Sequence, residues 1–158
     1  MDSVDRVKYL IENNNHMIVA TSDDNSKTWI SPVFFSYDKA FNLYWVSSKH
    51  ALHSQNIRKN KRVAIVIFGP VLSDGIDGAY FDADAIELED EKLIKEAVEF
   101  LQKRGQPDKF MIKSMSDVTG DAAWRIYKAI PKQISKREDA TDAKSGQAIT
   151  VRKDVKLK

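Results

Sequence analysis

The sequence predicts an α+β protein, a mainly antiparallel β-barrel of about six strands with flanking helices. Short apolar segments follow one another through brief polar turns, which is typical of antiparallel pairing. One long amphipathic segment falls late in the chain, and strands and helices do not alternate regularly, so a doubly wound fold is excluded. The 158 residues suit one domain. We expect residues 1–136 to form the barrel and residues 137–158 to add a polar loop and a basic C-terminal strand or tail.

The N-terminal third reads as a helix followed by a hairpin. Residues 3–14 carry apolar side chains at helical spacings of three and four, namely Val4, Val7, Leu10 and Ile11. Residues 17–21 and 28–37 flank the polar turn at 23–26 and predict two antiparallel strands. Pro32 lies inside the second strand. Because proline has no backbone N–H, it indicates a sheet edge, a bulge or a local break.

The middle of the chain predicts two strands around a short helix. Residues 43–46 form the first strand, and residues 50–59 form the helix, with Leu52 and Ile57 as candidate core contacts. Residues 62–68 read RVAIVIF. Such a continuous apolar run predicts a strand that is buried on both faces.

The second half predicts one clear strand and one clear helix. In residues 79–88 the apolar side chains alternate, so one face is buried and the other is wet. Residues 89–104 form an amphipathic helix that ends at Gly105, with the apolar stripe Leu93, Ile94, Ala97, Phe100 and Leu101.

The remaining elements are shorter. We expect a short helix within residues 107–115 and a strand over residues 124–130 that ends at Pro131. Ile134 and residues 148–151 indicate weak late strands, and the polar stretch 138–146 predicts a mobile loop.

Composition excludes several classes of protein. The absence of cysteine rules out disulfides, thiolate metal sites and cysteine nucleophiles. No segment approaches the roughly 20 apolar residues of a membrane span, and the N-terminus lacks a secretory pattern. A net charge of +2 from 25 basic and 23 acidic residues gives little basis for nucleic-acid binding. We therefore expect a cytoplasmic protein with no membrane or nucleic-acid partner.

The chemistry-bearing residues gather around one strand end. Ser47 and Ser48 end the predicted strand, and the following helix carries His53 and Ser54, with Lys49 nearby. Hydroxyls, helix N–H groups and an imidazole can together bind a phosphate. A helix-capping role for the two serines is the alternative. The six glycines are scattered and form no glycine-rich phosphate loop.

Metal binding and hydrolysis have weaker support. His50 and His53 stand at i and i+3, but the sequence supplies no obvious third ligand, so we predict no metal site. The acidic side chains between residues 80 and 87 are predicted to solubilise a strand face, and no GxSxG motif is present.

The order of these segments resembles a known family. WISPVFF, LYWVSS, HALHSQNI, RVAIVIF, AYFDADAIEL and WRIYKAIP follow one another as in the FMN-binding split barrels of the pyridoxamine 5'-phosphate oxidase-like superfamily. The similarity covers residues from about 5 to about 135 and consists of an ordered set of moderately specific motifs.

The resemblance implies an FMN-binding protein that acts as a flavin-dependent oxidoreductase on a small-molecule redox substrate, and a homodimer with cofactor sites at its interface. It places the flavin ring against the second strand and the phosphate at the third strand end and the next helix. The implied cofactor-binding residues are Ile30, Ser31, Pro32, Val33, Val46, Ser47, Ser48, Lys49, His53 and Ser54. No catalytic residue can be named.

The chain departs from the family pattern twice. Many relatives have Ser-Arg-Lys where this chain has Ala51-Leu52-His53, so two cations are replaced. The C-terminal segment 136–158 lacks the tryptophan-containing pattern of true pyridoxamine-phosphate oxidases, and that reaction is not assigned. A deazaflavin or haem remains an alternative cofactor, and a non-catalytic flavin or haem binding or sensor module on the same barrel remains an alternative function.

Overall fold

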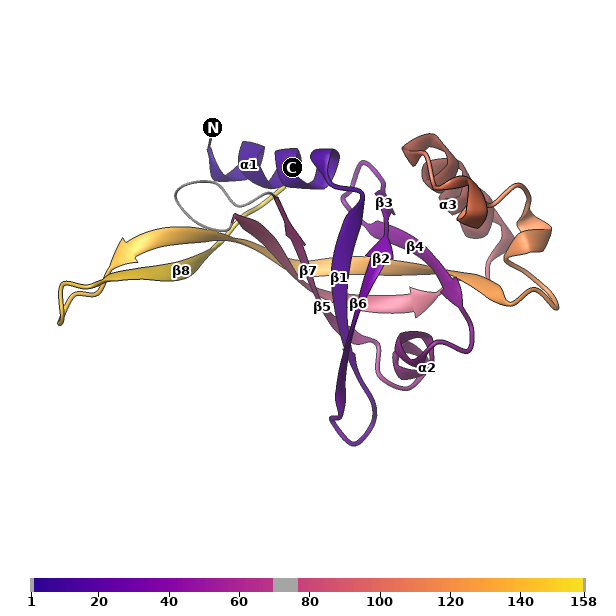
Figure 1. Ribbon diagram of the computed structural model, residues 1–158, viewed down its shortest axis with the longest axis horizontal. Helices are drawn as coiled ribbons and strands as arrows, with labels where there is room; N and C mark the ends of the chain where they lie inside the picture. Colours follow the sequence, from indigo (N-terminus) through magenta and orange to yellow (C-terminus); the bar gives the residue numbers. More distant parts are fainter. Residues whose placement is uncertain (1, 70–76, 158) are drawn as a thin grey trace.

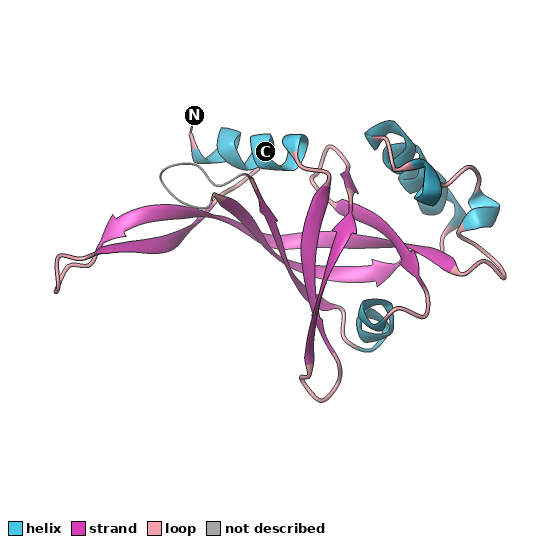
Figure 2. Ribbon diagram, viewed as in Figure 1, coloured by secondary structure: helices cyan, strands magenta, loops and turns pink. Residues whose placement is uncertain are grey.

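The computed structural model describes residues 2–69 and 77–157 and contains one large antiparallel sheet with three α-helices. Figures 1 and 2 show the sheet curling into an open barrel with helices around it. The helices are α1 (Ser3–Asn13), α2 (Leu52–Lys59) and α3 (Glu91–Arg104). The strands are β1 (His16–Ser22), β2 (Thr28–Phe34), β3 (Ser36–Tyr37), β4 (Leu43–Ser48), β5 (Arg62–Phe68), β6 (Gly78–Glu87), β7 (Trp124–Thr141) and β8 (Ala148–Asp154).

The sheet is an incompletely closed barrel. Its order is β2-β1-β5-β6-β7-β4-β3, with β8 paired to β7, and every pairing is antiparallel. The α+β prediction is confirmed, although eight strands replace the expected six. Among the described residues, no helix has the length and apolar character to cross a membrane.

The chain itself crosses from one end of this sheet to the other at Phe35. The predicted strand 28–37 is therefore two strands, because β2 pairs with β1 whereas β3 pairs with β4. Beyond this crossing, β2 and β4 flank the opening of the barrel without a shared ladder. Pro32 lies in β2, at the sheet edge, where a missing N–H is tolerated.

Two apolar cores stabilise the fold. The barrel interior contains Phe35, Trp45 and Tyr127, and the fully buried α1 residues Leu10 and Ile11 join the same cluster. The second core lies between α3 and the outer face of the sheet, and includes Ile94, Ala97, Leu101, Tyr44 and Ile126. Figure 1 shows α1 and α2 on opposite sides of the barrel and α3 beside β4.

Local sequence explains the ends of α1 and α3. The Asp2 side chain accepts a hydrogen bond from the Asp5 N–H, and the Asp90 side chain accepts one from the Leu93 N–H. Both are ordinary N-caps, which satisfy free amides of the first turn. Gly105 ends α3 with φ of 79°, a left-handed conformation that costs glycine little. The chain then turns toward the barrel opening.

Two expectations about burial were wrong. The run 62–68 is buried on one face only, because Val63, Ile65 and Ile67 point inward while Ala64 and Phe68 are exposed. On this second face Val66 is half-buried, and Arg152 of β8 lies over the ring of Tyr80, the residue that pairs with Val66. Ile57 is in the core as predicted, whereas Leu52 is 42% exposed at the first turn of α2.

The late part of the sheet also differs from expectation. Pro131 does not end a strand, since β7 continues to Thr141 and bulges near Lys132, where the register with β6 shifts. Residues 137–141 then pair with β8, so the expected polar loop 138–146 is largely a β-hairpin. Figure 1 shows this hairpin, which we call the arm (residues 137–154), projecting from the barrel.

The predicted helix over residues 107–115 was wrong as well. Two 3₁₀ turns, Asp108–Phe110 and Met115–Asp117, occupy this region. The short turns place Pro107 and Phe110 against the barrel opening.

The two leucines of α3 provide a matched test of this packing. Leu101 is fully buried, whereas Leu93, expected in the same apolar stripe, is 39% exposed. We predict that Leu101→Ala lowers the free energy of unfolding by about 2–5 kcal/mol because it leaves a cavity, and that Leu93→Ala costs less than about 1 kcal/mol. Urea denaturation measures both values. Equal losses would contradict the described orientation of α3.

Candidate functional site

A cavity of about 570 Å³ lies at the opening of the barrel between β2 and β4. Its volume is in the range of small-molecule and cofactor pockets. The lining residues come from six parts of the chain that the fold brings together: His16, Pro32, Val33, Phe34, Val46, Ser47, Ser48, His53, Gln106, Pro107, Phe110 and Trp124.

Strand alternation explains which side chains reach this cavity. His16 pairs with Phe34, and Ser48 pairs with Trp124. Directly opposed residues point to the same face of a sheet, so these pairs form two walls outside the barrel. Val33 lies on the opposite face, within the interior core, and reaches the cavity through the opening between the strands.

Six of the predicted cofactor-binding residues line the cavity, and the other four do not. The six are Pro32, Val33, Val46, Ser47, Ser48 and His53. Ile30 is 67% exposed and borders a separate cavity on the outer face of the sheet. Ser54 is fully buried and does not line the cavity.

Ser31 and Lys49 stand next to the cavity. The Ser31 hydroxyl contacts a cavity-lining ring, at 3.0 Å from His53 Nδ1. Lys49 follows β4, where its N–H donates to the Ala123 carbonyl and its own carbonyl accepts from Arg58. The Lys49 backbone therefore ties the end of β4 to its neighbours.

His53 connects the two strands that flank the opening. Its Nε2 lies 2.7 Å from Ser47 Oγ on β4, and its Nδ1 lies 3.0 Å from Ser31 Oγ on β2. Ser31 Oγ also accepts a hydrogen bond of 3.0 Å from Trp29 Nε1. A chain of polar contacts thus runs from Trp29 through Ser31 and His53 to Ser47 at the cavity.

The surroundings of His53 favour its neutral form. Burial lowers the pKa of the imidazole below its usual 6.5, because a charged ring loses hydration there. The apo cavity therefore contains a neutral His53 near pH 7.

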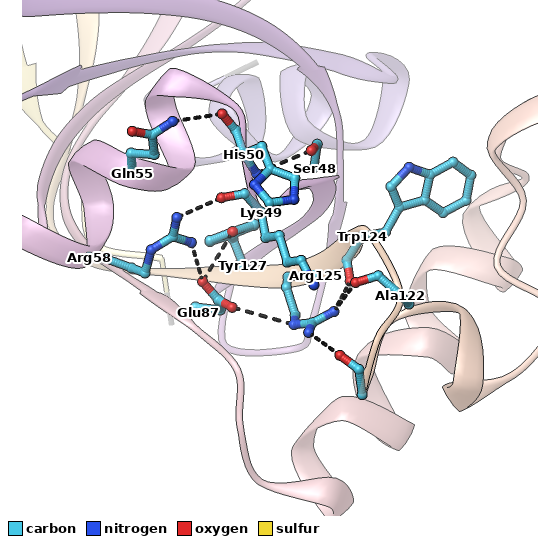
Figure 3. Close-up of polar contacts among 11 residues, drawn as sticks. Ser48, Lys49, His50, Gln55, Arg58, Glu87, Ala122, Trp124, Arg125 and Tyr127 are labelled. Carbon is cyan, nitrogen blue, oxygen red and sulfur yellow. Dashed lines mark hydrogen bonds and ion pairs between the residues drawn. The ribbon is translucent and has the colours of Figure 1, made fainter.

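A cluster of cations lies beside the cavity and is held by one carboxylate. Figure 3 shows Arg58 and Arg125 on either side of Glu87. Arg58 Nη1 is 2.8 Å from Glu87 Oε2, and this hydrogen bond raises the pKa of the guanidinium. The Tyr127 hydroxyl donates to the same carboxylate oxygen at 3.2 Å, and burial raises the pKa of this phenol.

Arg125 is committed to structural contacts. Its guanidinium donates to the carbonyls of Gly120, Ala122 and Trp124. Arg62 pairs with Asp82 on the exposed side of the sheet. Among the described residues, the lining of the cavity contains no lysine and no arginine, and its titratable side chains are His16 and His53.

Half of the residues that line the cavity were not predicted from the sequence. Gln106, Pro107 and Phe110 follow α3 and reach the cavity only because Gly105 reverses the chain direction there. Trp124 forms an aromatic pair with Phe110 at 6.2 Å between ring centroids. It reaches the cavity through the pairing of β7 with β4, which no sequence pattern had indicated.

No group of three side chains suited to metal ligation occurs among the residues that the structure describes. His50 contributes its N–H to the Ser48 hydroxyl and its carbonyl to Gln55, and its side chain is not part of the cavity. Of the two histidines in residues 50–54, only His53 lines the cavity.

Comparisons with known proteins agree on the fold. No family model matches the sequence, and no curated protein matches it by sequence. An FAD-binding protein from Mesorhizobium loti is similar with a TM-score of 0.64 and 19% identity, over 86% of this chain and 94% of that chain.

Two further solved structures show the same architecture. A protein provisionally named pyridoxamine 5'-phosphate oxidase from Listeria innocua gives a TM-score of 0.63 and 18% identity, over 85% of this chain and 98% of that chain. The haem storage protein HutZ from Vibrio cholerae gives 0.63 and 16%, over 85% and 94%. The chain has the same fold as these proteins, in agreement with the split barrel that the sequence resemblance predicted.

Proposed function

We propose that the protein binds FMN in the cavity between β2 and β4 and acts as a flavin-dependent oxidoreductase on a small-molecule redox substrate. The observation that carries this proposal is the composition of the cavity. Apolar and aromatic side chains line a space of about 570 Å³ together with hydroxyl and imidazole groups.

The residues present fit a flavin ring. Pro32, Val46 and Trp124 offer flat or apolar surfaces on both sides of the cavity, as expected for binding an aromatic ring system. Alternate backbone groups of an edge strand are free to hydrogen-bond a ligand, and β2 lies at the end of the sheet. Backbone groups of β2 can therefore hydrogen-bond the polar edges of the flavin ring without any charged side chain.

The residues also fit a phosphate, through neutral groups. Ser47, Ser48 and His53 would hold it, close to the start of α2. Hydroxyl and helix N–H donors suit anionic oxygens. Ser54 and Ile30 lie away from the cavity, so we propose no contact to the cofactor for them.

Bound FMN would supply the electron transfer, and the chain would position the ring and limit its exposure to water. Phe110 and Trp124 form the aromatic edge of the cavity, and Gln106 is buried beside it. These residues restrict access from the side of α3. Below this edge, His53 is held by two hydroxyls and keeps β2 and β4 at a fixed separation.

The reaction of true pyridoxamine-phosphate oxidases is not part of the proposal. The three tryptophans of the chain are Trp29, Trp45 and Trp124, so the C-terminal segment contains none. This segment forms the arm, whose strand β8 is exposed along its whole length.

Haem is the second candidate ligand, and one observation favours it. His16 lines the cavity and packs edge-on against Phe34 at 5.9 Å between ring centroids. Its imidazole is therefore available to a ligand, and one solved structure with this fold is a haem storage protein. On this alternative the protein would be a binding or sensing module without turnover.

We further propose that the protein is a homodimer formed through the outer face of the sheet. Ile18 and Tyr80 both pair with Val66 and share this face with it, and the exposed Ala64 lies alongside. The face borders a cavity of about 510 Å³. Exposed apolar patches of this kind mark association surfaces.

The first prediction concerns the location of the flavin. Val46→Trp would fill the cavity, so we predict at least a tenfold loss of FMN affinity, whereas Ile149→Trp on the arm, where Ile149 is exposed, should leave the affinity unchanged. Fluorescence titration of FMN measures both. Full affinity in Val46→Trp would place the flavin elsewhere.

The second prediction separates an enzyme from a carrier. FMN-loaded protein should oxidise NADH or NADPH with a redox acceptor present, and Val46→Trp should abolish the activity that depends on added FMN. Absorbance at the nicotinamide band follows the reaction. Bound FMN without turnover by either donor would favour the binding-module alternative.

The third prediction concerns the subunit contact. Val66→Glu buries a charge at the proposed interface, which is costly, so this variant should sediment as a monomer while the parent sediments as a dimer. Lys95→Glu changes an exposed residue of α3 and should remain dimeric. An unchanged mass for Val66→Glu would exclude this face.

A further inference from the structure

The cavity lacks a fixed positive charge among its described lining residues. Its polar side chains are hydroxyls, one amide and two imidazoles. A phosphate carries between one and two negative charges near neutral pH. An anion that enters a partly buried site without a cation favours the charged form of a nearby titratable group. His16 and His53 are the two groups that could respond.

The hydrogen bonds of His53 accommodate a second ring proton without rearrangement. Trp29 Nε1 can only donate, so Ser31 Oγ is an acceptor at 3.0 Å. Each hydroxyl oxygen has two lone pairs, and Ser31 can therefore accept from His53 Nδ1 as well. Ser47 can likewise accept from Nε2.

Protonation also changes what the cavity presents. In one neutral tautomer, His53 Nε2 accepts the Ser47 hydroxyl proton, and that proton faces the ring. In the charged form both ring nitrogens donate, so the Ser47 O–H is released to donate to a ligand in the cavity. The charged ring thus offers an anion both a positive charge and a freed hydroxyl donor.

We propose that His53 takes up a proton when the phosphate of the cofactor binds, and that this coupling sets the preference of the cavity for phosphorylated over unphosphorylated flavin. The proposal rests on the function proposed above. The cavity would then supply a positive charge that appears on binding, although its described lining contains no lysine and no arginine.

Lys49 follows Ser48 but does not line the cavity, and several other cations near His53 are engaged by protein groups. Arg125 is opposite Ser47 in the ladder, but it pairs with Glu87 and three carbonyls. Arg58, on the same helix, also bonds Glu87. Lys109 lies over the Phe110 ring at 5.6 Å from its centroid. His16, on the opposite wall, is the natural control.

The sign of the pH dependence follows from linkage. Burial lowers the pKa of His53 in the free protein, and an adjacent phosphate raises it. Between these two pKa values, binding takes up a proton. Affinity for the anion therefore rises as the pH falls through this window, by at most about tenfold per pH unit for one proton. Above the higher pKa the contribution is lost.

The experiment compares FMN with riboflavin, which lacks the phosphate, from about pH 5.5 to about pH 8.5. Dissociation constants are measured for the parent protein, His53→Gln, His53→Lys and His16→Gln. The phosphate of free FMN titrates near pH 6, and this contribution is the same for every variant, so ratios between variants remove it.

The expected result is specific to one histidine. Loss of FMN affinity in His53→Gln should grow as the pH falls, whereas riboflavin affinity should change by the same factor at every pH. His53→Lys should bind FMN more tightly than the parent at about pH 8 and show a flatter profile. His16→Gln removes a lining residue on the opposite wall, so it can change the affinity itself, but the slope of FMN affinity with pH should remain that of the parent. Parallel FMN profiles for the parent and His53→Gln would overturn the inference.

An NMR titration of the parent protein tests the proposal without any substitution, so it does not depend on whether the variants fold. The ring signals of His53 in NMR should titrate below about pH 6.5 in the free protein and at a higher pH with FMN, but not with riboflavin. An unchanged pKa with FMN bound would refute the coupling while leaving flavin binding intact. Failure of either flavin to bind at any pH would refute the proposed function together with this inference.

Discussion

The opening between β2 and β4 is the constraint on which the rest of the structure depends. A ladder between these strands would close the barrel and cover the free edge of β2. The chain prevents this closure because it leaves β1 after Phe34 and joins β4 at Ser36, so that the two strands diverge beyond the crossing. His53 then bridges the divergent strands through Ser31 and Ser47. Side-chain hydrogen bonds thus maintain a gap that backbone hydrogen bonds would otherwise fill.

This arrangement separates stability from binding. The barrel interior is packed with fully buried side chains such as Phe35, Trp45 and Tyr127, and interiors of this density tolerate little change. The cavity lies mainly outside the barrel wall, where β2, β4 and the turns after α3 contribute single side chains. Changes at His16 or Phe110 can therefore alter ligand preference with little cost to the core.

The arginines near the cavity contribute to the stability of the fold and do not line the cavity. Arg58 and Arg125 are held by Glu87 and by backbone carbonyls, and they stabilise the junction of α2, β6 and β7. A split barrel that binds a phosphate with lysine or arginine has a permanent charge in its cavity. In this protein the neutral lining leaves the choice of ligand to hydroxyls and histidines.

The sequence pattern correctly predicted the elements that depend only on residues close together in the chain. The alternation of Ala79, Phe81, Ala83 and Ala85 gave the buried face of β6, and Asp90 and Gly105 mark the ends of α3. The serine-ended strand and the helix with His53 were also correctly placed beside each other.

The errors have non-local causes. The run 62–68 is apolar on both sides, but only one side meets this chain's own core. Pro131 is accommodated by a bulge that depends on β6. Gln106 and Phe110 carry no pattern that associates them with a strand 60 or more residues earlier, because their position is set by the reversal at Gly105.

A crystal structure of the protein grown with FMN tests the central claim most directly. The account predicts the flavin ring between Pro32, Val46 and Trp124, with its phosphate within hydrogen-bonding distance of Ser47 and His53. Density for FMN at another surface, or a closed ladder between β2 and β4 that leaves no room for the ring, would contradict it.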